Sequence, residues 1–261
     1  MRRQMRAVKE TVSRPASVCT PRYALKKARA GVKLNRWELE GIADNPSHSL
    51  EYAQSVVRGP WEPGEAAIIR SSNCSLNYAR DVVHGRWEKG EAVIAGCAHA
   101  SLAYATAVVG GRWEKGESVI LTEFECAVKY AKTCVRGRWS ALEDSILGWV
   151  RKNKDWDWVD PVDMVTKYLK AIGGVRWSGL ESVLMEKNRA KLTYRYAVLT
   201  GGRLVPELHQ KMMMFSFDNK RSVWSKRYLR FLEVCERRAI RYMQDLDSES
   251  RAELISKVQR G

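Results

Sequence analysis

Five glutamates at equivalent places are the residues of this sequence whose type and spacing could do chemistry. Carboxylates brought close together can act as a general acid and a general base. The other residues do not support such a site, because the four histidines lack metal-ligand spacing and no nucleophile is paired with a base. We therefore predict a non-enzymatic protein with no cofactor, no bound metal and no small-molecule substrate. The glutamates are Glu65, Glu91, Glu117, Glu143 and Glu181.

Each of these glutamates lies four residues after a tryptophan, and the tryptophans mark an internal repeat. The first recognisable repeat is expected to open at Arg36-Trp37. A residue that recurs at a fixed interval of a few tens of positions is typical of a stacked array of small structural elements. The tryptophans that follow one another at intervals of 26 residues are Trp61, Trp87, Trp113 and Trp139.

The pattern within a repeat predicts a pair of helices. Tyr78, Val82 and Val83 have the i, i+4, i+5 spacing of one buried helical face. The glycine two residues before the next tryptophan is expected to end this helix in a left-handed conformation. A shorter helix is predicted to begin just after the tryptophan, with its glutamates in the first turn. The glycine three residues after the tryptophan disfavours a helix, so the helix is expected either to start at this glycine or to be irregular there.

One such helix pair cannot bury its own apolar face. Stacked copies bury a continuous core, so the predicted fold is an all-α solenoid of short helix pairs with a longer C-terminal capping helix at about residues 222–246. The tryptophan is expected at the seam between repeats, and the arginine before it should stack on a tryptophan or pair with the glutamate. The predicted parts are a basic arm (1–22), the array (23–205, with an insertion at about 147–163) and a basic helical cap (206–261).

Charge is concentrated at the two ends of the chain. The net charge of +15 divides into +10 over residues 1–36, −2 over 37–139 and +7 over 140–261. Basic ends favour an anionic partner, such as nucleic acid, an acidic protein or an anionic membrane. Six cysteines without Cys-x-x-Cys spacing favour a reducing compartment, and we predict the cytoplasm. Residues 92–111 are not expected to span a membrane, because the equivalent stretches of the sister repeats carry charges.

One repeat contains the whole motif, an Arg-Trp pair followed by Glu and Ile and then by Tyr-Ala and Val: Gly85-Arg86-Trp87, Glu91, Ile94, Tyr104-Ala105 and Val108. This motif resembles a helical repeat family known mainly from tailed bacteriophages and some large DNA viruses. The match is clear over residues 37–139, looser over 140–205, and absent from 1–22 and 206–261. The resemblance implies a viral origin, an all-α array and the cytoplasm of a host cell, and it brings no assigned catalytic residues.

The first predicted function is binding of nucleic acid, DNA or RNA, mainly through the backbone phosphates. The basic ends would make the contacts, so binding should be weakly sequence-specific and sensitive to salt. About six contacts would give the logarithm of the binding constant a slope of about −5 against the logarithm of the salt concentration. The predicted contact residues are Arg2, Arg3, Arg6, Lys26, Lys27, Arg29, Lys33, Arg227, Arg230, Arg237, Arg238 and Arg241.

The alternative function is a viral protein–protein interaction module that binds a host or virion protein. Solenoids present long surfaces that suit such partners. The insertion is rich in tryptophan, which dominates interface hot spots, although these side chains could equally cover the core. The predicted partner-binding residues are Trp149, Trp156 and Trp158.

Overall fold

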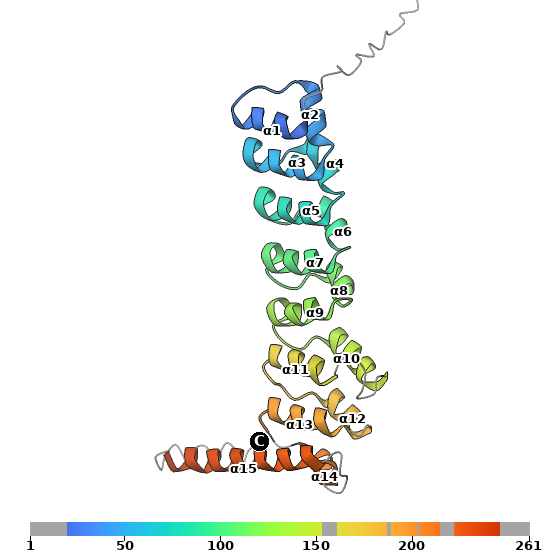
Figure 1. The fold of residues 1–261 in the computed structure, drawn as a ribbon, viewed down its shortest axis with the longest axis vertical. Coiled ribbons are helices and arrows are strands. Elements are labelled where there is room, and N and C mark those ends of the chain that lie inside the picture. The colour runs from blue at the N-terminus through green and yellow to red at the C-terminus, as the bar shows by residue number, and fades with distance from the viewer. Residues whose placement is uncertain (1–19, 153–160, 187–188, 203, 215–221, 246–261) are drawn as a thin grey trace, which may run out of the picture. The chain divides into compact units, whose positions relative to one another are not determined.

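All regular elements in the part of the chain that the structure describes are helices, which confirms the predicted all-α class (Figure 1). The chain forms two compact units, residues 1–135 and residues 136–261. The predicted division at residues 22 and 205 stays a prediction. The residues described by this computed structural model are 20–152, 161–186, 189–202, 204–214 and 222–245.

The N-terminal unit repeats one arrangement, in which a short helix is followed by a second helix that ends in a wider, π-helical turn. These π-helical turns are labelled η1 to η4. The elements are α1 (Pro21–Arg29), α2 (Arg36–Ala43), α3 (Pro46–Tyr52) with η1 (Ala53–Val57), α4 (Glu62–Ile68), α5 (Ser72–Tyr78) with η2 (Ala79–Val83), α6 (Glu88–Ile94), α7 (Ala98–Tyr104) with η3 (Ala105–Val109), α8 (Glu114–Ile120), and α9 (Phe124–Tyr130) with η4 (Ala131–Val135).

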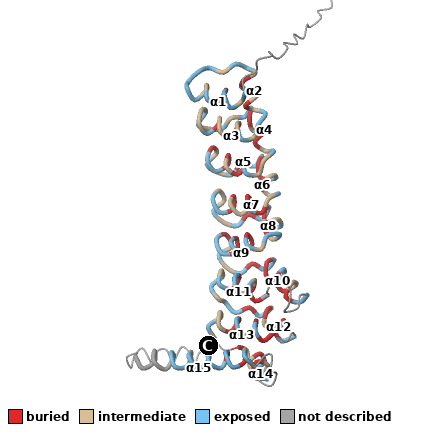
Figure 2. The backbone as a smooth tube through the Cα atoms, viewed as in Figure 1, coloured by how far each residue is buried: buried red, intermediate tan, exposed pale blue. Residues whose placement is uncertain are grey.

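Within this unit the helices form two rows (Figure 1). The second helices α3, α5, α7 and α9 pack in succession against one another, and the short helices α4, α6 and α8 lie in the other row. Tyr78 and Val82 are buried, as the apolar spacing predicted, whereas Val83 is half-buried, and Figure 2 shows buried residues in both rows. The core therefore runs between stacked helix pairs, which confirms the solenoid-like architecture.

The short helices begin regularly, one residue after the tryptophan, so the start or irregularity expected at the glycine is not found. Trp87 is the N-cap residue of α6, and Glu88 and Glu91 lie in its first turn. Gly90 serves another purpose, because a Cβ atom there would lie 2.4 Å from the Trp87 ring. The glycine leaves room for the indole to lie against the helix backbone.

The second helices end one residue earlier than predicted. The left-handed residue that ends η2 is His84, with φ 55°, and the expected Gly85 has no positive φ. The reason is the π-helical turn, in which the N–H groups of His84 and Gly85 both donate to the Ala79 carbonyl. Arg58 and Gly110 take the equivalent left-handed place in the neighbouring repeats.

The C-terminal unit has the same alternation with longer helices. The described helix α10 runs on to Lys152, so the first residues of the predicted insertion lengthen this helix, while residues 153–160 lie outside the described chain. The last described helix confirms the predicted long C-terminal helix. The elements are α10 (Ser140–Lys152), α11 (Pro161–Ala171), α12 (Ser178–Glu186), α13 (Ala190–Leu199), α14 (Pro206–Met214) and α15 (Ser222–Asp245).

Among the helices that the structure describes, none has the length and apolar character needed to cross a lipid bilayer. The uncharged stretch 92–111 is divided between α6, α7 and η3, as expected from its sister repeats.

Candidate functional site

The repeated glutamates lie at the centre of a network of donors. Glu91 is buried and accepts hydrogen bonds from Arg86 at 2.7 and 2.9 Å. The Tyr104 hydroxyl donates to it at 3.1 Å, and Lys115 of the next repeat donates at 2.7 Å. The prediction that the arginine pairs with the glutamate is confirmed. The same Arg–Glu pair recurs in Arg112–Glu117, Arg138–Glu143 and Arg176–Glu181.

This network keeps the carboxyl group of Glu91 ionised. Burial by itself raises the pKa of Glu91, but the donors Lys115, Arg86 and Tyr104 outweigh it and hold the pKa below its ordinary value. A general acid or base needs a pKa near the working pH and access to the substrate. The Glu91 carboxylate therefore has the features of a structural ion pair.

Tyr78 joins two successive tryptophans of the array. The Tyr78 hydroxyl accepts a hydrogen bond from the backbone N–H of Trp61 at 2.8 Å and donates to Glu65 at 3.0 Å. Its ring packs on Trp87 of the next repeat, with 4.6 Å between ring centroids. Tryptophan therefore lies at the seam between repeats, as predicted. Equivalent ring pairs are Tyr52–Trp61, Tyr104–Trp113 and Tyr168–Trp177.

We expect the fold to lose stability as the pH rises from about 10 to about 12. Burial is the largest cause that raises the pKa of Tyr78, Tyr130 and Tyr196 to about 12. Tyrosine in an unfolded chain titrates at about 10, so the stabilisation is complete below that pH and is lost as the pH passes through the folded-state value. Phenolate absorbance and helical circular dichroism should change over the same interval. Phenolates that form at about pH 10 with the helices intact would contradict this expectation.

The predicted phosphate-binding residues of the N-terminal end differ in how far they are engaged. Lys27 forms an ion pair with Glu38 at 2.6 Å, and Arg29 forms one with Glu51 at 2.6 Å. These carboxylates would compete with a phosphate for the two cations. Lys26 and Lys33 have exposed side chains, and Arg2, Arg3 and Arg6 lie outside the described residues.

Five basic residues of α15 have described side chains, all of them exposed, and none of the five forms an ion pair with a carboxylate of the described chain. Four of them were predicted as contact residues, and Lys226 was not. Arg241 belongs to α15, but its side chain is outside the described part. The exposed cations of this helix are Lys226, Arg227, Arg230, Arg237 and Arg238.

A surface pocket between α13 and α15 adds residues that the sequence analysis missed. Its volume is about 380 Å³, and Arg195 of α13 lines it together with Arg227 and Arg230 of α15. No pattern in the sequence identifies Arg195, which is exposed beside the buried Tyr196 and meets Arg227 and Arg230 only because α13 packs on α15. The remaining lining residues are Tyr194, Phe231 and Val234.

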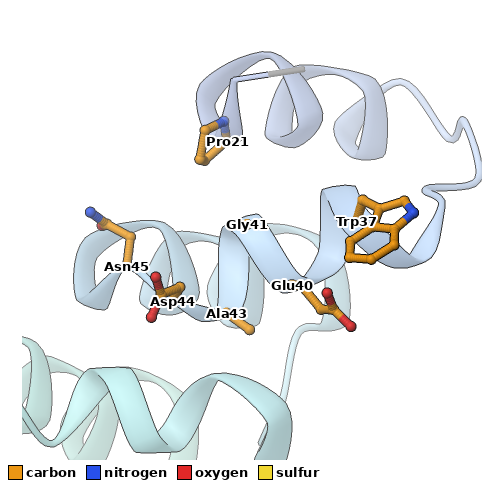
Figure 3. Close-up of a pocket in the computed structure, with 7 residues that line it drawn as sticks. All are labelled: Pro21, Trp37, Glu40, Gly41, Ala43, Asp44 and Asn45. Atoms are coloured by element: carbon orange, nitrogen blue, oxygen red, sulfur yellow. The ribbon is translucent and has the colours of Figure 1, made fainter. Parts of the chain in front are cut away.

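A second pocket, of about 650 Å³, opens against α2 in the N-terminal unit. Figure 3 shows the Trp37 indole at one end of it and the Asp44 and Asn45 side chains toward the other. Its two carboxylates already have partners, since Glu40 pairs with Arg36 at 2.7 Å and Asp44 with Arg70 at 3.4 Å. The pocket is lined by Pro21, Trp37, Glu40, Gly41, Ala43, Asp44 and Asn45.

Of the predicted partner-binding residues, only Trp149 is described. It lies on α10 and is half-buried, and Trp156 and Trp158 lie outside the described residues. Over the described ranges, no three His, Cys, Asp or Glu side chains come together as metal ligands. No protein-family model, curated protein or solved structure matches the chain.

Proposed function

We propose that the protein is a non-enzymatic helical-repeat protein that binds nucleic acid through the backbone phosphates, with α15 as its main contact. The observation that supports this proposal is the row of exposed cations on α15, which have no carboxylate partner among the described residues. Phosphate binding requires such cations, because an arginine that is already ion-paired adds little to the attraction of an anion.

The repeats provide the contrast. Lys89 pairs with Glu65, Lys115 with Glu91, and Arg112 with Glu117, each at 2.7 Å. The charges of this part of the chain are therefore largely balanced, in line with the net charge of −2 over residues 37–139. In our proposal the array is a scaffold, and its basic ends attract the nucleic acid.

Binding of this kind has consequences that do not depend on base sequence. Contacts to phosphate release counterions, so affinity should fall steeply with salt concentration and differ little between sequences. We also propose, on the resemblance of the Gly-Arg-Trp repeat to the viral helical repeats, that the protein acts in the cytoplasm of an infected host cell.

The triple variant Lys226→Gln/Arg237→Gln/Arg238→Gln tests the role of α15. If all three residues contact phosphates of a duplex, their loss should make the dependence of affinity on salt less steep, with the slope smaller in magnitude by about 2.7. The affinity at ~0.15 M salt should fall by about a hundredfold. Fluorescence anisotropy with a labelled duplex at several salt concentrations measures both. The expected cause is the loss of cation–phosphate contacts, with no change in helix content.

A variant with the same loss of charge serves as the control. Arg36, Arg70 and Arg80 are exposed and already pair with carboxylates, so their triple substitution by glutamine should cost little stability and little affinity. An equal loss of affinity in both variants would show that net charge alone drives binding, and the proposed role of α15 would be withdrawn.

The alternative remains a viral module that binds a host or virion protein. The observation that favours it is the pocket against α2, whose lining combines the Trp37 indole with the carboxylates of Glu40 and Asp44. In this reading Trp149, Trp156 and Trp158 anchor a partner, and Trp156→Ala should abolish its capture while the fold stays intact. Capture that survives Trp156→Ala would count against this alternative.

A further inference from the structure

The pocket between α13 and α15 combines cations with aromatic rings. Arg195, Arg227 and Arg230 have exposed side chains around it, and the half-buried rings of Tyr194 and Phe231 also line it. The described residues that line the pocket include no acid. An anion would therefore meet no repulsion from the pocket lining, and a flat apolar group would find a ring to lie on.

One of the arginines is held in place. The guanidinium of Arg227 lies 4.7 Å from the centroid of the Trp224 ring, and that ring lies 5.9 Å from the Tyr194 ring. A cation held over an indole loses less freedom when it binds a further anion. The Trp224 ring restricts the Tyr194 ring as well. Both kinds of contact are therefore partly preorganised.

This combination distinguishes single-stranded from double-stranded nucleic acid. Proteins that bind single strands neutralise the backbone with a basic groove and stack bases on aromatic side chains. In a duplex both faces of each base are already stacked on neighbouring base pairs, so a ring on the protein surface gains nothing from them. The arginines attract either form, but the rings can contact only bases that are unstacked.

We propose that the α13–α15 pocket is a single-strand site. A base lies on Phe231, and the phosphates on either side of it pair with the three arginines. This proposal rests on the proposed function and adds to it a preference for single-stranded DNA or RNA over duplex. The remaining cations of α15 then extend the contact along the backbone.

The test compares Phe231→Leu with the intact chain, using labelled oligonucleotides of about 12 nucleotides as single-stranded DNA, single-stranded RNA and duplex. Leucine keeps an apolar side chain and removes the ring. Single-strand affinity should fall about tenfold, with the salt slope unchanged, since one stacked base is lost and no phosphate contact. Duplex affinity should not change. Tyr23→Leu is the control, because it removes an exposed aromatic ring from α1.

The possible outcomes separate the two proposals. If the intact chain binds neither form, the proposed function fails and the pocket proposal fails with it. If Phe231→Leu leaves single-strand binding intact, or weakens strand and duplex equally, the pocket proposal is overturned and phosphate binding by α15 stands. Circular dichroism checks the fold of each variant. Should Phe231→Leu not fold, Arg195→Gln provides the second test. The salt slope of single-strand binding should then become smaller in magnitude by about 0.7, and an unchanged slope would contradict the proposal.

Discussion

Replacing Trp113 with alanine should lower the free energy of unfolding by about 3–5 kcal/mol. The indole is 3% exposed and packs on Tyr104 with 4.7 Å between ring centroids. Its Nε1–H group is buried with no hydrogen-bond partner in the described chain, so the variant loses packing and no side-chain hydrogen bond. Gly116 lies directly against the ring, so removing the indole would leave a cavity where two neighbouring repeats are in contact. Urea unfolding followed by circular dichroism measures the change.

Trp37→Ala is the matched control for this variant. Trp37 is half-buried and lines a surface pocket near the start of the described array, with no repeat tyrosine packed against its ring among the described contacts. We expect a loss of about 1 kcal/mol or less. Equal losses for the two variants would mean that the seam does not carry the stability we assign to it.

Gly90→Ala should destabilise the fold by about 3 kcal/mol, although alanine is the better helix former by about 1 kcal/mol. The new Cβ atom would lie 2.4 and 2.6 Å from two atoms of the Trp87 ring and 3.2 Å from Ser75. The indole cannot move away easily, because its other side packs on Tyr78. The steric cost therefore exceeds the gain in helix propensity. The midpoint of thermal unfolding should fall accordingly.

Gly85→Ala gives the opposite expectation in the same repeat. A Cβ atom at Gly85 would have no neighbour within 4 Å, and its φ is not in the left-handed region. Alanine there should be neutral or should stabilise the fold by up to about 1 kcal/mol, because it restricts the unfolded chain. If Gly90→Ala and Gly85→Ala had the same effect, the close approach of Trp87 to the helix backbone would not be the cause.

The repeat spacing was enough to predict the paired helices, the seam tryptophan and the Arg–Glu pair, because each depends on residues at constant separations. The repeat that was predicted to open at Arg36-Trp37 is out of register with the others by two residues, and the reason is physical. Ile42 and Ile68 are equivalent buried residues 26 apart, so the place of Trp61 falls on Asn35. Asn35 caps α2 by a capping box, and Trp37 lies two residues further on, inside the helix.

Other features depended on backbone geometry or on partners distant in the sequence. The π-helical turn that places His84 in the left-handed conformation has no recognised residue pattern, so Gly85 was the natural expectation. The partner of Arg29 is Glu51, in the next helix pair, and a charge count does not reveal it. Arg195 becomes a candidate only when α13 and α15 are seen to share a pocket.

The Lys–Glu ion pairs between neighbouring repeats limit how the length of such a chain can change. Lys89 reaches Glu65, and Lys115 reaches Glu91, across the same separation of 24 residues. Every bond of this kind joins a repeat only to its immediate neighbour. Removing one whole period, residues 87–112, would bring Lys115 opposite Glu65 with no partner lost. Growth or shortening in steps of 26 residues is therefore compatible with the fold.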